Sequence, residues 1–173
     1  MADAKSKKAS TPLIAEYPSA TIPGIPRFVF AVPEGWVIDS APGTLCVVRQ
    51  AVADSDGFWV NAIIRHDTVA RSVDFERVAK ATWAKLKRST PSAVDHGERI
   101  ARFGDNVVYL RGVDLDGPMG RPLSQVQGMF FAPVTGGGKL VDFFQIIGTA
   151  QRDGSVQANM NAFVEVISSF RFV

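Results

Sequence analysis

Apolar and polar residues alternate over much of the chain, and this period of two predicts a sheet of several strands. The first such run is Phe28–Val32, which presents large apolar groups on one face. Pro33 ends this strand because proline lacks the N–H that a strand ladder needs, and Gly35 allows the chain to turn. We expect Trp36 to begin the next strand and to fold back over the first.

Further strands are predicted where apolar runs are separated by glycine-rich turns. They cover residues 44–50, 58–65, 97–103, 107–113, 123–132 and 140–148. The first of these is apolar at nearly every position, so we expect it to be buried on both faces. In the second, Trp59 falls on the opposite face from Phe58 and Val60.

Two stretches have the apolar spacing of amphipathic helices. The first lies between Ser72, the expected N-cap, and Pro91. Its stripe comprises Phe75, Val78, Ala79, Thr82, Trp83 and Leu86. The second follows Asp153-Gly154-Ser155, and its stripe comprises Val156, Met160, Phe163, Val164 and Ile167. This order of elements predicts an α+β fold, with an antiparallel β-sheet of about six to seven strands flanked by helices.

Composition divides the chain into a tail and one domain. Residues 1–21 are rich in Lys, Ser, Ala and Pro and predict a flexible N-terminal tail, of which we expect the first dozen residues to be disordered and dispensable. Residues 22–173 predict a single domain, in keeping with 46% hydrophobic and 21% charged residues over the whole chain. The net charge of +2 is too small to indicate a polyanionic partner.

The sequence contains no run of about 18 apolar residues, so we expect no transmembrane segment. The N-terminal lysines are not followed by the hydrophobic stretch of a secretory signal. We therefore expect a cytoplasmic protein as the chain is given, with an envelope or secreted location left open if the chain is trimmed. Cys46 is the single cysteine and lies in an apolar run, which favours an inert buried thiol.

The segments Phe28-Val29-Phe30 and Val32-Pro33-Glu34-Gly35-Trp36, a helix ending in basic residues, meandering strands and a C-terminal helix resemble the PsbP/Mog-type fold. Within it, the chain resembles the actinobacterial LpqN/LpqT family, whose members often begin with a Pro-Gly-aromatic lead-in before a Pro-x-Gly-Trp turn. Here the lead-in is Ile22-Pro23-Gly24-Ile25, with an aliphatic residue in place of the aromatic one, and the resemblance covers residues from about 22 to 173.

This resemblance implies non-catalytic binding of a partner in envelope or secretion processes, although proteins of this fold share no single activity. Members of the family are typically lipoproteins with a lipidated cysteine near the N-terminus. Cys46 lies inside a predicted strand and no signal precedes it, so envelope anchoring does not carry over to this chain.

Residues with catalytic or metal-binding chemistry are few. His66 and His96 are the only histidines, no Gly-x-Ser-x-Gly elbow accompanies them, and their spacing with Cys46 does not suit a zinc site. Gly136-Gly137-Gly138 leads into a strand rather than a helix, so a hairpin connection is favoured over a phosphate cradle. We therefore expect no cofactor, no metal and no enzymatic activity.

Basic residues on the first helix, namely Arg77, Lys80, Lys85, Lys87 and Arg88, could form a patch for acidic partners. No aromatic residues are interleaved with them for base stacking, so nucleic-acid binding is disfavoured against a solvated helix face.

Adjacent aromatic pairs such as Phe130-Phe131 cannot both point into one core. Either helices cover both faces of the sheet, or one face forms a hydrophobic groove for a ligand or partner. We expect any contact surface to use the face of one strand shared by Gln125, Gln127, Met129 and Phe131, with Trp59 as a further aromatic anchor. The alternative is that the C-terminal helix covers this face.

Two functions remain in view. The favoured one is a non-catalytic binding or adaptor module that docks a protein or an apolar small molecule. The alternative is a small enzyme with a site in the groove between sheet and helix. The sequence leaves the partner and the oligomeric state open.

Overall fold

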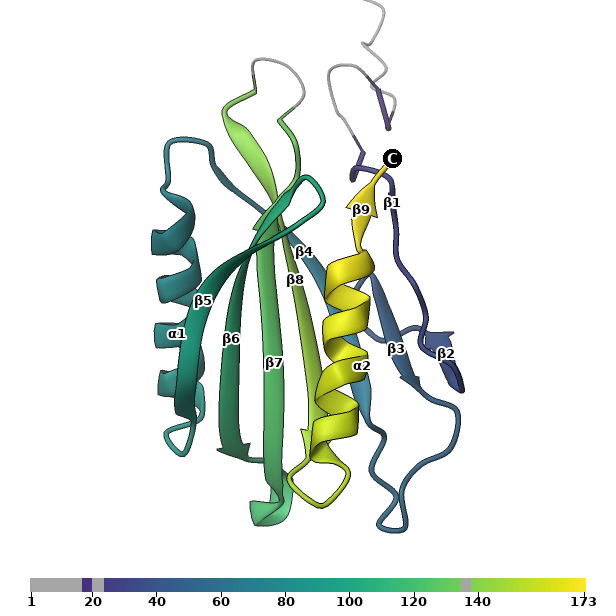
Figure 1. Ribbon diagram of the computed structural model, residues 1–173. Coiled ribbons are helices and arrows are strands. Elements are labelled where there is room, and N and C mark those ends of the chain that lie inside the picture. The colour runs from purple at the N-terminus through teal and green to yellow at the C-terminus, as the bar shows by residue number, and fades with distance from the viewer. Residues whose placement is uncertain (1–16, 20–23, 135–137) are drawn as a thin grey trace, which may run out of the picture.

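The computed structural model describes residues 17–19, 24–134 and 138–173, and this part of the chain forms an antiparallel sheet of seven strands with a helix on each face (Figure 1). In spatial order the strands are β2 (Trp36–Asp39), β3 (Cys46–Gln50), β4 (Asn61–Ala70), β8 (Leu140–Gln151), β7 (Pro122–Phe131), β6 (Asn106–Asp116) and β5 (Val94–Phe103). The expected α+β class and strand number are confirmed. A short 3-10 turn, Pro118–Gly120, links β6 to β7.

Helix α1 (Phe75–Ser89) packs on one face of the sheet, close to β6 and β7. Its N-cap is Asp74, whose carboxylate accepts a hydrogen bond from the Arg77 amide at 3.1 Å, and not Ser72 as the sequence predicted. A carboxylate at this position satisfies a free amide of the first turn and also favours the positive end of the helix dipole. The helix ends at Ser89 and is capped by Thr90, ahead of Pro91, as expected.

Helix α2 (Val156–Ser169) crosses the opposite face and covers the larger core. Phe163, Val166 and Ile167 are fully buried there. Two strand glycines allow the close approach: a Cβ built on Gly148 would lie 2.1 Å from Phe163 Cγ, and one on Gly128 would lie 3.0 Å from Ile167 Cγ2. The absence of a side chain at these positions therefore sets how near the helix sits to the sheet.

The first strand is shorter than predicted and has a different neighbour. β1 is only Phe28–Val29, and it pairs with β9 (Arg171–Phe172) at the other end of the chain in a separate two-stranded sheet. The turn from Pro33 forms as expected, with the Trp36 amide donating to the Pro33 carbonyl at 3.1 Å. The prediction that Trp36 folds back over the first strand was wrong, because β2 pairs with β3. The indole instead packs against the ring of Phe163 in a T-shaped arrangement, with ring centroids 5.8 Å apart.

Residues 44–50 are not buried on both faces as expected. Val48 is fully buried under the α2 side, whereas Val47 and Arg49 on the other face are only half-buried because α1 does not extend over β3. Most of the predicted tail, part of the Ile22–Ile25 lead-in and most of the triple glycine lie outside the described residues. The predicted disorder of the first dozen residues lies outside them as well and stays a prediction.

Candidate functional site

The face of the sheet that carries α1 is only partly covered by it. Helix α1 packs on Tyr109, Met129 and Phe143, near the β6–β7 side. On the same face, farther toward β3, side chains of β3, β4, β8 and early β7 stay half-buried. We call this region the open face, and its members are Val47, Arg49, Asn61, Ile63, Gln125, Gln145, Ile147 and Thr149, with Trp59 at its margin.

Trp59 lies at the margin of the open face and is 41% exposed. The guanidinium of Arg49 lies over its indole, 4.1 Å from the ring centroid. Arg49 is itself held by Asp39, whose Oδ2 accepts from the arginine Nε at 2.9 Å. The Ser40 amide and Arg49 stabilise the charged form of Asp39 and lower its pKa. The stacked guanidinium and its aspartate partner therefore hold the exposed indole from one side.

A hollow of about 350 Å³ lies beside this stacked pair. Its lining combines Asp39, Ser40, Ala41, Val47, Arg49, Trp59 and Asn61. The Asn61 side-chain amide donates to the Trp59 carbonyl at 2.7 Å, which fixes the approach to β4. The hollow therefore offers an aromatic ring, an aliphatic floor and charges of both signs.

Gln125 and Gln127 connect the open face to the part under α1. The Gln127 Nε2 donates to Gln125 Oε1 at 3.0 Å, and Gln125 Nε2 donates to the hydroxyl of Thr149 at 3.2 Å. Gln125 is half-buried and reachable from the open face, whereas Gln127 is only 7% exposed. Of the two amides, only Gln125 is accessible from the open face.

Met129 and Phe131 lie beneath α1. Met129 is 1% exposed, and its sulfur accepts a hydrogen bond from the Thr82 hydroxyl at 3.1 Å. The Phe131 ring packs against Phe75 of α1, with ring centroids 5.0 Å apart. The apolar stripe of α1 packs on this end of β7, so Met129 is buried and not available at a surface. The alternative that the C-terminal helix covers this face is also wrong, since α2 packs on the other face.

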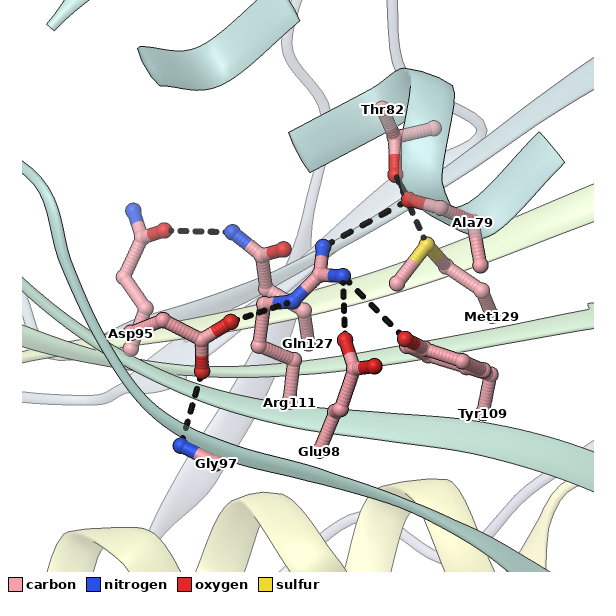
Figure 2. A network of polar contacts seen from close by, with 10 residues as sticks. Ala79, Thr82, Asp95, Gly97, Glu98, Tyr109, Arg111, Gln127 and Met129 are labelled. Carbon is pink, nitrogen blue, oxygen red and sulfur yellow. Dashed lines mark hydrogen bonds and ion pairs between the residues drawn. The ribbon is translucent and has the colours of Figure 1, made fainter. Parts of the chain in front are cut away.

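A buried arginine lies between the sheet and α1 and was missed in the sequence (Figure 2). The Arg111 side chain is 0% exposed, and its Nη2 lies 2.9 Å from Glu98 Oε2 and 3.3 Å from the Tyr109 hydroxyl. Its Nε faces Asp95 Oδ2 at 3.4 Å. A charged residue inside the apolar run 107–113 was the signal that could have revealed it, because a buried charge needs partners.

This network changes the ionisation of its members. Burial and a hydrogen bond with Glu98 raise the pKa of Tyr109 to about 12. Hydrogen bonds from Tyr109 and Arg111 lower the pKa of Glu98. The phenol therefore stays protonated and Glu98 stays ionised at neutral pH, so the group acts as a fixed ionic bridge under α1.

The two histidines each pair with an aspartate. His66 Nε2 lies 2.7 Å from Asp142 Oδ1, and His96 Nε2 lies 2.9 Å from Asp114 Oδ2. Asp114 also accepts from the Ser124 hydroxyl, so the carboxylate stands between serine and imidazole. A nucleophilic serine needs the imidazole as its proton acceptor, and this order does not provide it.

A second hollow, of about 390 Å³, lies on the α2 face between Val164 of the helix and strands β5–β7. His96, Arg99 and Val126 are among its lining residues. This is the groove between sheet and helix that the enzyme alternative requires. Among the described residues, no group of three His, Cys, Asp or Glu side chains is placed to hold a metal ion.

The basic residues of α1 serve local roles in part. Lys87 Nζ donates to the carbonyls of Pro91 and Ala93 at 2.7 and 2.6 Å, beyond the end of the helix. Lys80 lies 3.8 Å from Glu76, one turn earlier on the exposed side. Over the described part of the chain, neither helix is long and apolar enough to cross a membrane.

The seven-stranded antiparallel sheet with one helix on each face is the fold of PsbP- and LpqN-type proteins, as the sequence resemblance implied. The crystal structure of LpqN, described as involved in cell envelope biogenesis of Mycobacterium tuberculosis, matches with a TM-score of 0.72 at 15% identity, over 87% of this chain and 86% of that chain. The solution structure of cyanobacterial PsbP (CyanoP) from Synechocystis sp. PCC 6803 matches with a TM-score of 0.54 at 14% identity, over 84% of this chain and 86% of that one. No protein-family model matches the sequence. No curated protein matches it either.

Proposed function

We propose that the protein is a non-catalytic binding module that docks a protein partner on the open face. The observation that carries this proposal is Trp59, a large aromatic left 41% exposed just before β4, with the Arg49 guanidinium over its ring. Trp and Arg are the residues most enriched among binding hot spots. Fixing them in advance lowers the entropy that association must overcome.

The shape of the open face favours a protein over a small apolar molecule. Pockets for small molecules bury most of the ligand surface. Here the hollow is shallow and joins a wider surface that carries Ile63, Ile147 and Gln125. An apolar centre with polar groups around it matches the pattern of a protein interface. The predicted role in envelope or secretion processes stays a prediction, because identities near 15% carry the fold alone.

The experiment compares capture of partners from the source cell's lysate by wild type, Trp59→Ala and the matched control Leu140→Ser. Leu140 is 59% exposed and pairs with Ala70, at the end of β4 farthest from Asn61, so its change alters exposed apolar area without touching the site. We expect one captured protein to be lost with Trp59→Ala, by roughly tenfold or more as for a hot-spot residue, and to be retained by the control.

A photo-crosslinking side chain in place of Ile63 tests the location directly. The same group in place of Lys85, on the exposed side of α1, is the control. Crosslinking of the captured protein from Lys85 but not from Ile63 would refute the open face as the docking site. Turnover in a hydrolase substrate panel, abolished by His96→Ala, would instead support the enzyme alternative.

A further inference from the structure

The outer edge of β5 is the longest free strand edge in the described sheet. β5 has ten residues, whereas β2 at the opposite edge has four. Gly97, with a φ of 113°, forms a bulge between Asp95 and Glu98. Regular pairing therefore extends over residues 98–103, and a strand edge of this length can pair with another strand.

The direction of the free backbone groups follows from the β5–β6 hairpin. Phe103 faces Asn106 across the two-residue turn at 104–105, so this pair exchanges its hydrogen bonds within the hairpin. Hydrogen-bonded and open positions alternate along an antiparallel ladder. Glu98, Ile100 and Arg102 therefore present their N–H and C=O groups to the open edge.

When two copies of this strand run antiparallel, the side chains of these three residues complement those of the other copy. A two-fold axis at Ile100 places Glu98 of one copy opposite Arg102 of the other, twice, and places Ile100 opposite itself. Axes at Glu98, Arg99 or Arg102 would set like charges opposite one another, which destabilises a pair. An axis at Ala101 would form no charge pair. One register is thus selected.

The same edge carries exposed apolar surface. Ile100 is 52% exposed, and Val107 on the neighbouring strand is 38% exposed on the same face. Two-fold pairing would bring the two copies of Ile100 together at the axis, with Val107 of each copy one strand further out on the same face. Glu98 already holds Arg111 through Oε2, which fixes its side chain at this edge.

We infer that β5 pairs antiparallel with β5 of a second copy of this chain, about a two-fold axis at Ile100, and joins the two sheets into one. About six main-chain hydrogen bonds, two ion pairs and a small apolar centre would hold the dimer. The interface lies at the lower end of specific interface sizes, so the dimer is weak and depends on concentration. This inference does not use the open face and is independent of Trp59.

Sedimentation equilibrium of the full chain between roughly 10 µM and 1 mM, the range for weak interfaces, tests the association. The weight-average mass should rise from 18.7 kDa toward twice that value. Arg102→Glu sets two carboxylates opposite each other and should weaken the dimer about tenfold or more. Arg77→Glu makes the same charge change on exposed α1 and should leave it intact. A monomer at every concentration would overturn the inference.

The register is tested by disulfide trapping in a Cys46→Ser background. Facing residues of an antiparallel pair have Cα atoms about 5.5 Å apart, within reach of a disulfide. Ile100→Cys should therefore form a covalent dimer under mild oxidation. Val94→Cys, on the same strand and also 52% exposed, should remain monomeric because this register moves it far from its copy. Equal trapping at both positions, or none at Ile100, would refute the axis.

Discussion

Replacement of Gly148 by alanine tests how closely α2 sits on the sheet. The new Cβ would lie 2.1 Å from Phe163 Cγ and 2.5 Å from two further ring carbons. The ring would have to retreat by roughly 1.4 Å to restore normal contact. Phe163 is fully buried and the edge of Trp36 packs against it, so the ring has no free space to enter.

The expected change in the free energy of unfolding of Gly148→Ala is the balance of two opposing effects. Alanine in place of glycine in a strand gains about 0.5–1 kcal/mol, because the unfolded chain loses less freedom on folding. Overpacking a core costs about 1–3 kcal/mol, and loss of the phenylalanine contacts costs about 3–5 kcal/mol if the ring is expelled. We expect a net loss of about 3 kcal/mol in the free energy of unfolding.

Two other glycines supply a matched series measured by urea denaturation. Gly128→Ala meets the buried Ile167 side chain at 3.0 Å, a smaller overlap than at Gly148, and should cost about 1 kcal/mol. Gly112→Ala meets His96 Cβ at an ordinary 3.6 Å and should be neutral or stabilising by up to about 1 kcal/mol. The midpoints should therefore rank Gly112→Ala, Gly128→Ala and Gly148→Ala from most to least stable, at a constant m-value.

A double-mutant cycle isolates the proposed clash. Phe163→Ala removes the ring, so adding Gly148→Ala in that background should cost nothing or even stabilise the domain. If Gly148→Ala is as harmful without the ring as with it, or if all three alanine variants have equal midpoints, the close approach of α2 does not explain the role of this glycine.

Three further outcomes concern side chains that are partly or fully buried. In a Tyr17→Phe variant, Tyr109 is the remaining tyrosine, and its absorbance should titrate near pH 12. Because the pKa of Tyr109 is raised in the folded protein, the stability it contributes is present below pH ~10 and is lost as the pH rises toward about 12. A titration midpoint near pH ~10 would contradict the buried network. Trp36→Ala should cost roughly 3 kcal/mol through lost packing on Phe163, and an unchanged denaturation midpoint would show that this contact contributes nothing. Burial raises the pKa of the Cys46 thiol, so its reaction with a thiol reagent at pH 8 should be slow until urea unfolds the chain, whereas rapid labelling of the folded protein would show an accessible thiol.

Local sequence determined most of the secondary structure. The 3.6-residue spacing from Phe75 to Leu86 predicted α1, and the turn after Phe103 predicted the β5–β6 hairpin, because both depend on neighbours only a few residues away. The adjacent rings of Phe130 and Phe131 left open whether helices cover both sheet faces or one face forms a groove. In the structure Phe130 lies in the core under α2 and Phe131 packs beside α1, because successive side chains on a strand point to opposite sides.

The candidate surface was predicted less well. Alternation placed Gln125, Gln127, Met129 and Phe131 on one face, and the register confirms that shared face. It could not show where along β7 the covering helix ends, so Met129 was expected at a surface and lies under α1. The length and position of a helix relative to a distant strand are decided by packing and not by the strand's own pattern.

Only the tertiary structure decided contacts between distant segments. β1 pairs with β9 from the opposite end of the chain, Trp36 reaches Phe163, and the Arg111 guanidinium lies 5.1 Å from the ring centroid of Trp83 on α1. Each of these contacts depends on how whole faces fit together, which adjacent residues do not encode. The sequence determined which segments become strands and helices because their hydrogen bonding and alternation are local, whereas packing of complementary surfaces decided which segments meet.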